Sequence, residues 1–148
     1  MNAGQFVNEL AAMAPSIAEY KQHGLSAEEA ASFRERFLCK KRQRPLGIAE
    51  SNDLFALMNQ WHTDAIEIGM IVLADAPTKT QQGTQVGKVE ADPLLIHADG
   101  EMVVHELHAP AHTLWPVAKS PNDFLNAVVV AAKFLTDRGM GKDRKSVV

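Results

Sequence analysis

The sequence of 148 residues lacks several features that mark particular classes of protein. Its single cysteine, Cys39, excludes an intrachain disulfide and a zinc site built from several cysteines, and we expect its thiol to be inert. The formal net charge of -3 offers no general attraction to nucleic acid or to an anionic membrane. No apolar run approaches the ~20 residues that span a bilayer, and the first residues do not have the pattern of a signal peptide. We therefore expect a cytoplasmic protein.

Residues 86–106 predict a β-hairpin that turns at Asp99 and Gly100. An Asp-Gly pair tolerates the positive φ angles of a two-residue turn, and this turn would place Ile96 opposite Val103. Apolar residues would then line both faces of the hairpin, with Leu94, Ile96 and Val103 on one face and Leu95, Met102 and Val104 on the other. A ribbon of this kind has to be covered on at least one side, so we expect an apolar helix to pack on it.

Four segments have the periodicity and the end signals of helices, namely residues 6–14, 26–38, 51–61 and 120–139. Ser26 and Glu29 form a capping box at the start of the second segment. In the fourth segment Ser120 is placed to cap the first turn and Gly139 is placed to end the helix. The fourth helix has a wide apolar face, which consists of Phe124, Leu125, Val128, Ala131, Ala132 and Leu135. We expect this face to pack on the sheet.

The basic run at residues 40–44 follows the second predicted helix. Positive charge at the C-terminal end of a helix opposes the exposed carbonyl groups there. This position accounts for the run without a nucleic-acid partner, and no aromatic or further basic residues adjoin it.

Residues 68–73 are rich in β-branched side chains and predict a strand that pairs with the hairpin. Residues 74–85 are polar, contain Pro77 and Gly83, and predict a mobile surface loop. Residues 140–148 are small and charged and are expected to fray. The predicted fold is therefore a single α+β domain, with helices packed against a mostly antiparallel sheet.

Four histidines, namely His97, His105, His108 and His112, raise the alternative of a metal site. The predicted register places the first two on opposite faces of the hairpin, which opposes a shared site. A folded-back loop could still bring the last two together with Glu106. The chain has no glycine-rich phosphate loop and no Gly-x-Ser-x-Gly turn. We expect no catalytic residues, no metal and no cofactor, with a small metal-dependent enzyme built on residues 97–112 as an alternative.

Three motifs in the C-terminal part of the chain resemble the SUKH superfamily, which includes cell-wall assembly regulators and bacterial toxin-immunity proteins. They are the lead from Gly87 to Asp92 into a strand, the turn at residues 99–101, and the helix entry at residues 117–120 followed by Phe124 and Leu125. The resemblance implies a single SUKH-like domain over residues 1–148 with no enzymatic activity of its own. Immunity members of the superfamily bind and block a cognate toxin, commonly a nuclease, and other members act as intracellular regulators or scaffolds.

Acidic residues and one tryptophan are the candidate partner-binding residues. Enzymes that cleave nucleic acid present basic clefts, and a complementary acidic surface speeds encounter and excludes wrong partners. The candidates are Asp64, Glu67, Glu90, Asp92, Asp99, Glu101, Glu106 and Trp115. We expect an immunity protein that binds a cognate toxin domain, with a regulatory or scaffold module of the same fold as the alternative. An unprotected strand edge could also support a homodimer.

Overall fold

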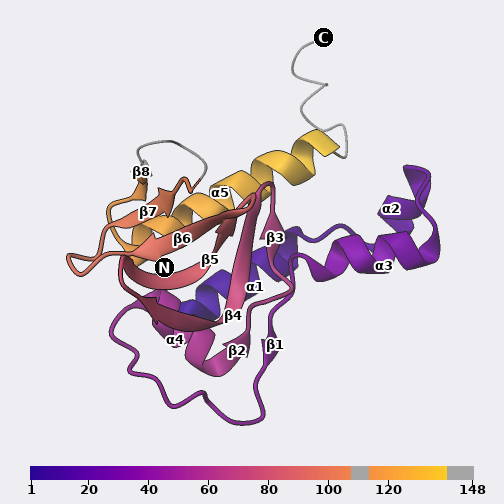
Figure 1. Ribbon diagram of the computed structural model, residues 1–148. Helices are drawn as coiled ribbons and strands as arrows, with labels where there is room; N and C mark the ends of the chain where they lie inside the picture. The colour runs from indigo at the N-terminus through magenta and orange to yellow at the C-terminus, as the bar shows by residue number, and fades with distance from the viewer. Residues whose placement is uncertain (108–113, 140–148) are drawn as a thin grey trace.

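Six strands pair in the order in which they occur along the chain, so the main sheet is an antiparallel meander (Figure 1). The structure is a computed structural model and describes residues 1–107 and 114–139. The strands are β3 (Glu67–Ile68), β4 (Ile71–Thr80), β5 (Gly83–Val89), β6 (Asp92–Ile96), β7 (Met102–His105) and β8 (Leu114–Ala118). The strand predicted at residues 68–73 lies partly in β4, which pairs with β3 and β5. It therefore pairs with residues 87–89, the start of the segment predicted to be the hairpin, but these residues belong to β5, which separates β4 from the β6–β7 hairpin.

The described residues form five helices, which are α1 (Ala3–Met13), α2 (Ile17–Gln22), α3 (Ala27–Glu35), α4 (Asp53–Gln60) and α5 (Pro121–Gly139). The four predicted helical segments are confirmed, and α2 is an additional short helix. Helices α1, α2 and α3 each begin with a capping box, which satisfies amide groups of the first turn. Asn52, one residue after the predicted Ser51, caps α4 by accepting from the Phe55 amide at 2.8 Å. The Ser120 hydroxyl caps α5 as predicted, accepting from the Asp123 amide at 3.1 Å.

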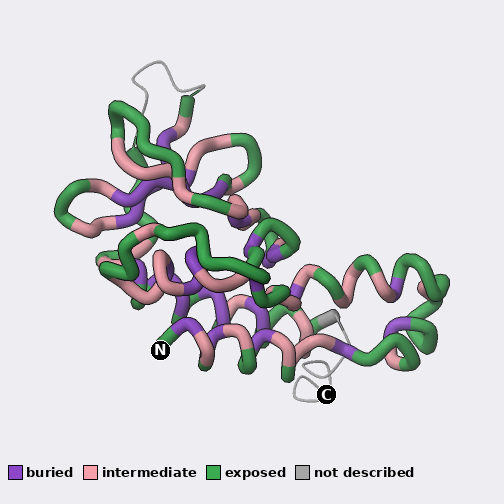
Figure 2. The backbone as a smooth tube through the Cα atoms, turned by 90° about the horizontal axis from the view of Figure 1, so that it is seen from below, coloured by how far each residue is buried: buried purple, intermediate pink, exposed green. Residues whose placement is uncertain are grey.

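Helices α1, α4 and α5 pack on one another and on one face of the sheet, whereas α2 and α3 contact each other and project as an arm (Figure 1). The predicted packing of the last helix on the sheet is confirmed. Phe124, Leu125 and Val128 of α5 are buried in the same cluster as Leu94 and Met102 of the sheet. Burial of each such side chain contributes about 1.5–3 kcal/mol. Figure 2 shows that the buried residues are concentrated in this body, and that the residues of the arm are largely exposed or half-buried. The α+β fold class is confirmed.

The β6–β7 hairpin turns through three residues, not the predicted two. The His97 amide donates to the Glu101 carbonyl at 2.9 Å, and residues 98–100 lie between them. Gly100 has a φ of 90°, the left-handed conformation that closes a common three-residue hairpin loop. Because Asp-Gly is compatible with either loop length, the local sequence did not decide between them.

The longer loop shifts the hairpin by one residue from the predicted register. The observed pairs are Leu94 with Val104, Leu95 with Val103 and Ile96 with Met102. Met102 and Val104 therefore share the core face with Leu94 and Ile96, and Val103 lies with Leu95 on the other face, which corrects the predicted assignment. Apolar residues line both faces, as predicted, and they are buried on both, because Leu95 and Val103 are each 2% exposed.

Residues 74–85, predicted to be a mobile loop, form most of a second hairpin. β4 continues to Thr80, residues 81–82 form the turn, and β5 begins at Gly83. Pro77 lies in a bulge of β4, where the missing amide interrupts no regular ladder. The prediction was wrong because polar side chains on an exposed hairpin have the same local pattern as a loop. Backbone pairing with neighbouring strands decides the structure.

The basic run at residues 40–44 does not lie at a helix end, which corrects the prediction. α3 ends at Glu35, and β1 (Lys40–Lys41) pairs with β2 (Trp61–His62) in a separate two-stranded sheet. Arg42 then turns into the protein and is buried. The local sequence of this short segment is compatible with a helix end and with a strand. The strand that pairs with it lies 20 residues further along the chain, so local sequence could not predict the pairing.

Two further expectations concern the C-terminal residues and the absence of a membrane-spanning helix. Residues 140–148, which were predicted to fray, lie outside the described residues, as do His108 and His112. Within the described residues, no helix combines the length and the apolar character needed to cross a bilayer.

Candidate functional site

Strand β8 exposes an aromatic side chain at the edge of the sheet. It is the last strand of the described sheet, and residues 114–117 are all exposed. Trp115 is 55% exposed, although its backbone pairs with Val104 of β7. The indole Nε1 donates to the Glu106 carboxylate at 2.5 Å, which orients the ring. We define the β8 edge surface as Asp92, Glu106, Leu107, Leu114, Trp115 and Val117.

Three of the predicted acidic residues lie at the same end of the sheet as Trp115. Because neighbouring strands are antiparallel, the start of β6, the end of β7 and the start of β8 meet at one end. Asp92 begins β6, and its carboxylate accepts from the Leu107 amide at 3.3 Å. Glu106 follows β7, and Glu90 lies in the turn before β6. This end of the sheet therefore combines carboxylates with exposed apolar side chains.

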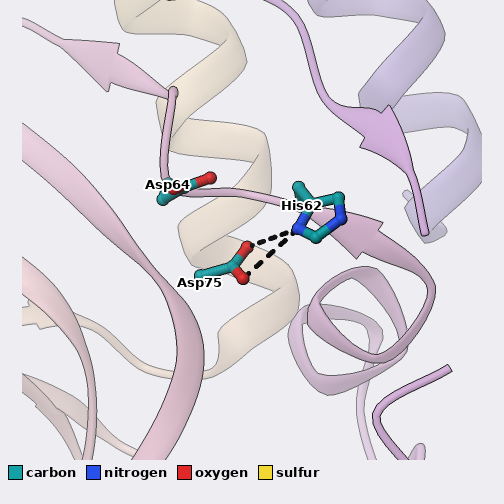
Figure 3. A group of neighbouring side chains, drawn as sticks. All are labelled: His62, Asp64 and Asp75. Carbon is teal, nitrogen blue, oxygen red and sulfur yellow. Dashed lines mark hydrogen bonds and ion pairs between the residues drawn. The ribbon is translucent and has the colours of Figure 1, made fainter. Parts of the chain in front are cut away.

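The other predicted acidic residues lie elsewhere. Asp99 and Glu101 occupy the β6–β7 turn at the opposite end of these strands, where the Asp99 carboxylate accepts from the Glu101 amide at 2.9 Å. Glu67 forms an ion pair of 3.1 Å with Arg36 of the connection after α3. Asp64 lies beside the β2 strand end (Figure 3). The eight predicted residues therefore do not form one surface, because their positions depend on strand order.

The described part of the histidine-rich segment does not bring its imidazoles together. With the observed register, His97 and His105 lie on the same face of the hairpin, not on opposite faces as predicted. They lie near opposite ends, about four residues or ~13 Å apart along the strand direction at the usual rise per residue. This separation is too long for two ligands of one metal ion.

A cluster that the sequence analysis missed joins Arg42, His62 and Asp75. The Arg42 Nη1 lies 3.1 Å from the Asp75 carboxylate, its Nη2 donates to the Asp75 backbone carbonyl, and its Nε donates to the Met58 carbonyl at 2.9 Å. The Arg42 side chain is only 6% exposed. All three guanidinium nitrogens therefore have acceptors, which is the condition for burying an arginine without a large penalty.

His62 and Asp75 face each other across the β2–β4 junction (Figure 3). The His62 Nδ1 lies 3.2 and 3.3 Å from the two Asp75 carboxylate oxygens, and Nε2 points away from them. Burial raises the pKa of the Asp75 carboxyl, but hydrogen bonds from Arg42 and His62, the Arg42 charge and the Thr63 amide together hold this pKa below its ordinary value. Asp75 is therefore ionised at neutral pH and accepts from three groups on two segments, the Arg42 side chain and residues 62–63.

The same region offers one ligand atom each from His62, Asp64 and Asp75, all within 4.8 Å of one another. One imidazole and two carboxylates suit a divalent transition metal by type. The Arg42 guanidinium, however, already neutralises Asp75, and a metal dication at the same carboxylate would be repelled by it. We therefore assign the cluster a structural role, in which it ties β4 to the segments around β1 and β2.

A cavity of about 570 Å³ opens beside this cluster, and it is lined by Glu35, Leu38, Cys39, Lys40, His62, Asp64 and Ala65. Burial raises the pKa of the Cys39 thiol to about 12. The thiol is therefore protonated at neutral pH, and a protonated thiol is a poor nucleophile. The cavity presents an imidazole and carboxylates, but its described lining contains no activated nucleophile.

Comparisons with protein-family models, with curated proteins and with solved structures find no match. The class of protein is thus defined by the architecture, an α+β domain in which α1, α4 and α5 cover one face of a six-stranded antiparallel sheet. The resemblance to the SUKH superfamily rests on the sequence motifs.

Proposed function

We propose that this protein is a protein-binding module without enzymatic activity of its own, and that it neutralises a toxin domain by binding it. The observation that carries the proposal is Trp115, exposed on an edge strand and held in place by Glu106. The motifs similar to those of the SUKH superfamily support the immunity role, because immunity members of that superfamily act by binding. The β8 edge surface is the proposed docking site.

Trp115 has the properties of an interface anchor. Tryptophan is enriched among the residues that dominate binding energy, because its ring buries a large area. Its indole nitrogen already donates to Glu106. A partner can therefore cover the ring without leaving a buried unpaired donor, and the oriented ring loses little conformational freedom on binding.

Pro116 affects how a partner can approach β8. A proline in an edge strand removes one backbone donor, which discourages a further strand from pairing there. The partner is therefore expected to contact the side chains of the β8 edge surface. Pairing of two copies along this edge, the homodimer raised from the sequence, is disfavoured by the same residue.

The carboxylates around Trp115 favour a basic partner. Asp92 and Glu106 belong to the β8 edge surface, and Glu90 lies at the same end of the sheet. Toxins that cleave nucleic acid need basic clefts, and complementary charge speeds their association with an acidic surface. Because exposed charges are screened by salt, the association rate should fall as the ionic strength rises.

A regulatory or scaffold module could use the same surface. The two roles differ in the consequence of binding, since an immunity protein abolishes the activity of its partner and a scaffold leaves it intact. The difference can be measured once a partner has been identified.

The test is co-expression with any toxin domain encoded next to this protein, with cell survival and complex formation as readouts. We expect wild-type protein to protect cells and to form a stoichiometric complex, and Trp115→Ala and Glu106→Gln to weaken both. The matched controls are Leu46→Ala, an exposed apolar side chain outside the surface, and Glu101→Gln at the far end of the hairpin. Both controls should protect as well as wild type.

Three results would contradict parts of the proposal. Failure to bind and to protect against any neighbouring toxin would contradict the immunity role. A complex in which the partner stays active would support the scaffold role instead. Full protection by Trp115→Ala would show that the docking site lies elsewhere.

A further inference from the structure

The outer face of α5 carries an exposed apolar stripe that the fold does not use. Val130 is 69% exposed and Phe134 is 53% exposed, and Ala127 on the same face is also exposed. At 100° per residue these three positions lie within about 60° of one another around the helix. They point away from Leu125 and Ala132, which are fully buried against the rest of the protein.

Charged residues stand at the two ends of this stripe. Asp123 is exposed in the first turn of α5, and Arg138 is exposed in the last turn. The Arg138 guanidinium lies 5.8 Å from the centre of the Phe134 ring, so it lies alongside the stripe. We define the α5 seam as Asp123, Ala127, Val130, Phe134 and Arg138. The spacing of its apolar members, three and four residues, is that of the contact positions of paired helices.

We propose that two copies of this protein pair through their α5 seams, with the two helices antiparallel. The two-fold axis would pass between Val130 and Ala131. Asp123 of each copy would then face Arg138 of the other, and Phe134 of each copy would face Ala127 of the other. This symmetric arrangement places the same surface of both copies in contact, as a two-fold dimer requires.

Charge and side-chain volume both select the antiparallel orientation. A parallel pair would place Asp123 against Asp123 and Arg138 against Arg138, and like charges repel. It would also place Phe134 against Phe134 and leave a gap between two copies of Ala127. In the antiparallel pair the Phe134 ring of each copy packs on the small Ala127 side chain of the other, which allows close helix packing. The Asp123 carboxylate of each copy faces the Arg138 guanidinium of the other.

The proposed dimer does not rest on the proposed toxin-binding function, because it is inferred from the α5 seam, which shares no residue with the β8 edge surface. A contact limited to one helix from each copy is small, so we expect a reversible dimer. Sedimentation velocity on the full chain from about 5 µM to about 500 µM covers the dissociation constants of such interfaces. A rise in sedimentation coefficient with concentration is the expected result.

Two substitutions test the apolar part of the seam. Val130→Glu and Phe134→Glu should each raise the dissociation constant at least about tenfold, because they bury a carboxylate at the contact. Glutamate favours the helix more than valine does, so Val130→Glu should keep the fold, and circular dichroism checks this. Trp115→Ala, which removes an equally exposed aromatic side chain outside the seam, should leave the dimer unchanged.

Charge reversal tests the orientation. Asp123→Arg alone and Arg138→Asp alone should each weaken the dimer at least about threefold, and the double variant should restore it, because the reversed charges again face each other. A chain that stays monomeric at about 500 µM, or a dimer that survives both glutamate substitutions, would overturn the proposal. A double reversal that fails to restore a dimer lost in the single variants would overturn the antiparallel register.

Discussion

The Arg42 guanidinium and the Asp75 carboxylate lie 3.1 Å apart, although 33 residues of chain separate them. Arg42 follows β1 in the two-stranded sheet, and Asp75 lies in β4 of the main sheet. Arg42 also donates to the Met58 carbonyl of α4. One side chain therefore joins both sheets and a helix of the core layer, and most of it is withdrawn from water.

We predict that Arg42→Ala lowers the free energy of unfolding by about 3 kcal/mol, because it leaves the Asp75 charge and two carbonyl groups without their donor. Arg42→Lys should restore little of this lost stability, since an ammonium group lacks the planar guanidinium geometry that reaches all of these acceptors. Urea unfolding measures both. The control is Glu67→Gln in the half-exposed pair with Arg36, which should cost less than about 1 kcal/mol. Equal losses of unfolding free energy in Arg42→Ala and Glu67→Gln would contradict the assignment of a structural role to Arg42.

The lowered pKa of Asp75 predicts a dependence of stability on acid pH. The pKa of the Asp75 carboxyl is lower in the folded than in the unfolded state, so the folded protein binds this proton less tightly. The ionised carboxylate therefore contributes its full share of the folding stability above the pKa of the unfolded state, which is about 3.9. This stability contribution disappears as the pH falls through the pKa of the carboxyl in the folded state. The stability difference between wild type and Asp75→Asn should therefore be constant from about pH 5 to 7 and narrow below about pH 4. Urea unfolding at a series of pH values tests this, and a difference that widens towards low pH would contradict it.

Two glycines should respond to alanine for different reasons. Gly100→Ala should cost about 1–2 kcal/mol, because the φ of 90° is unfavourable for alanine and no atom of the described residues lies within 4 Å of the added methyl group. Gly87→Ala should cost about 3 kcal/mol or more, because the methyl group would collide with the Val72 carbonyl oxygen of β4. Thermal unfolding of the two variants gives the comparison. A larger effect at Gly100 would contradict the observed strand approach.

The Cys39 thiol should react slowly in the folded protein. With its pKa raised to about 12 by burial, the thiolate fraction at pH 8 is about a thousandfold below that of an unperturbed cysteine. Iodoacetamide labelling followed by mass spectrometry should show slow modification in buffer and rapid modification in denaturing urea. Rapid labelling of the folded chain would indicate that the thiolate is stabilised, and would reopen nucleophilic chemistry in the adjoining cavity.

Added zinc should not stabilise the protein through His62, Asp64 and Asp75, because the Arg42 guanidinium already occupies the Asp75 carboxylate. The measurement is thermal unfolding with and without a roughly tenfold excess of Zn²⁺ over protein. Stabilisation that His62→Ala abolishes would contradict the structural assignment and favour a metal centre.

Local signals were sufficient for the four longer helices and for the fold class, and the short helix α2 was not predicted. Capping residues such as Ser26 and Ser120, and apolar positions three and four residues apart, act within one or two turns of chain. The apolar character of both faces of the β6–β7 hairpin was also evident from the order of its residues. The length of the hairpin loop at Gly100 could not be predicted, because an Asp-Gly dipeptide closes both two-residue and three-residue turns. A difference of one residue in this loop moves every side chain of the following strand to the opposite face of the sheet.

The sequence by itself determined where the four longer helices lie, the α+β character and the apolar nature of α5, because each depends on interactions between near neighbours. Tertiary structure alone decided that residues 74–85 become a hairpin, that Arg42 is buried against Asp75, and that Glu106 and Asp92 gather near Trp115 while Asp99 lies at the far end. The physical reason is that strand order and register are set by contacts between distant residues, whose free energies are realised only when the whole sheet and its helices pack together.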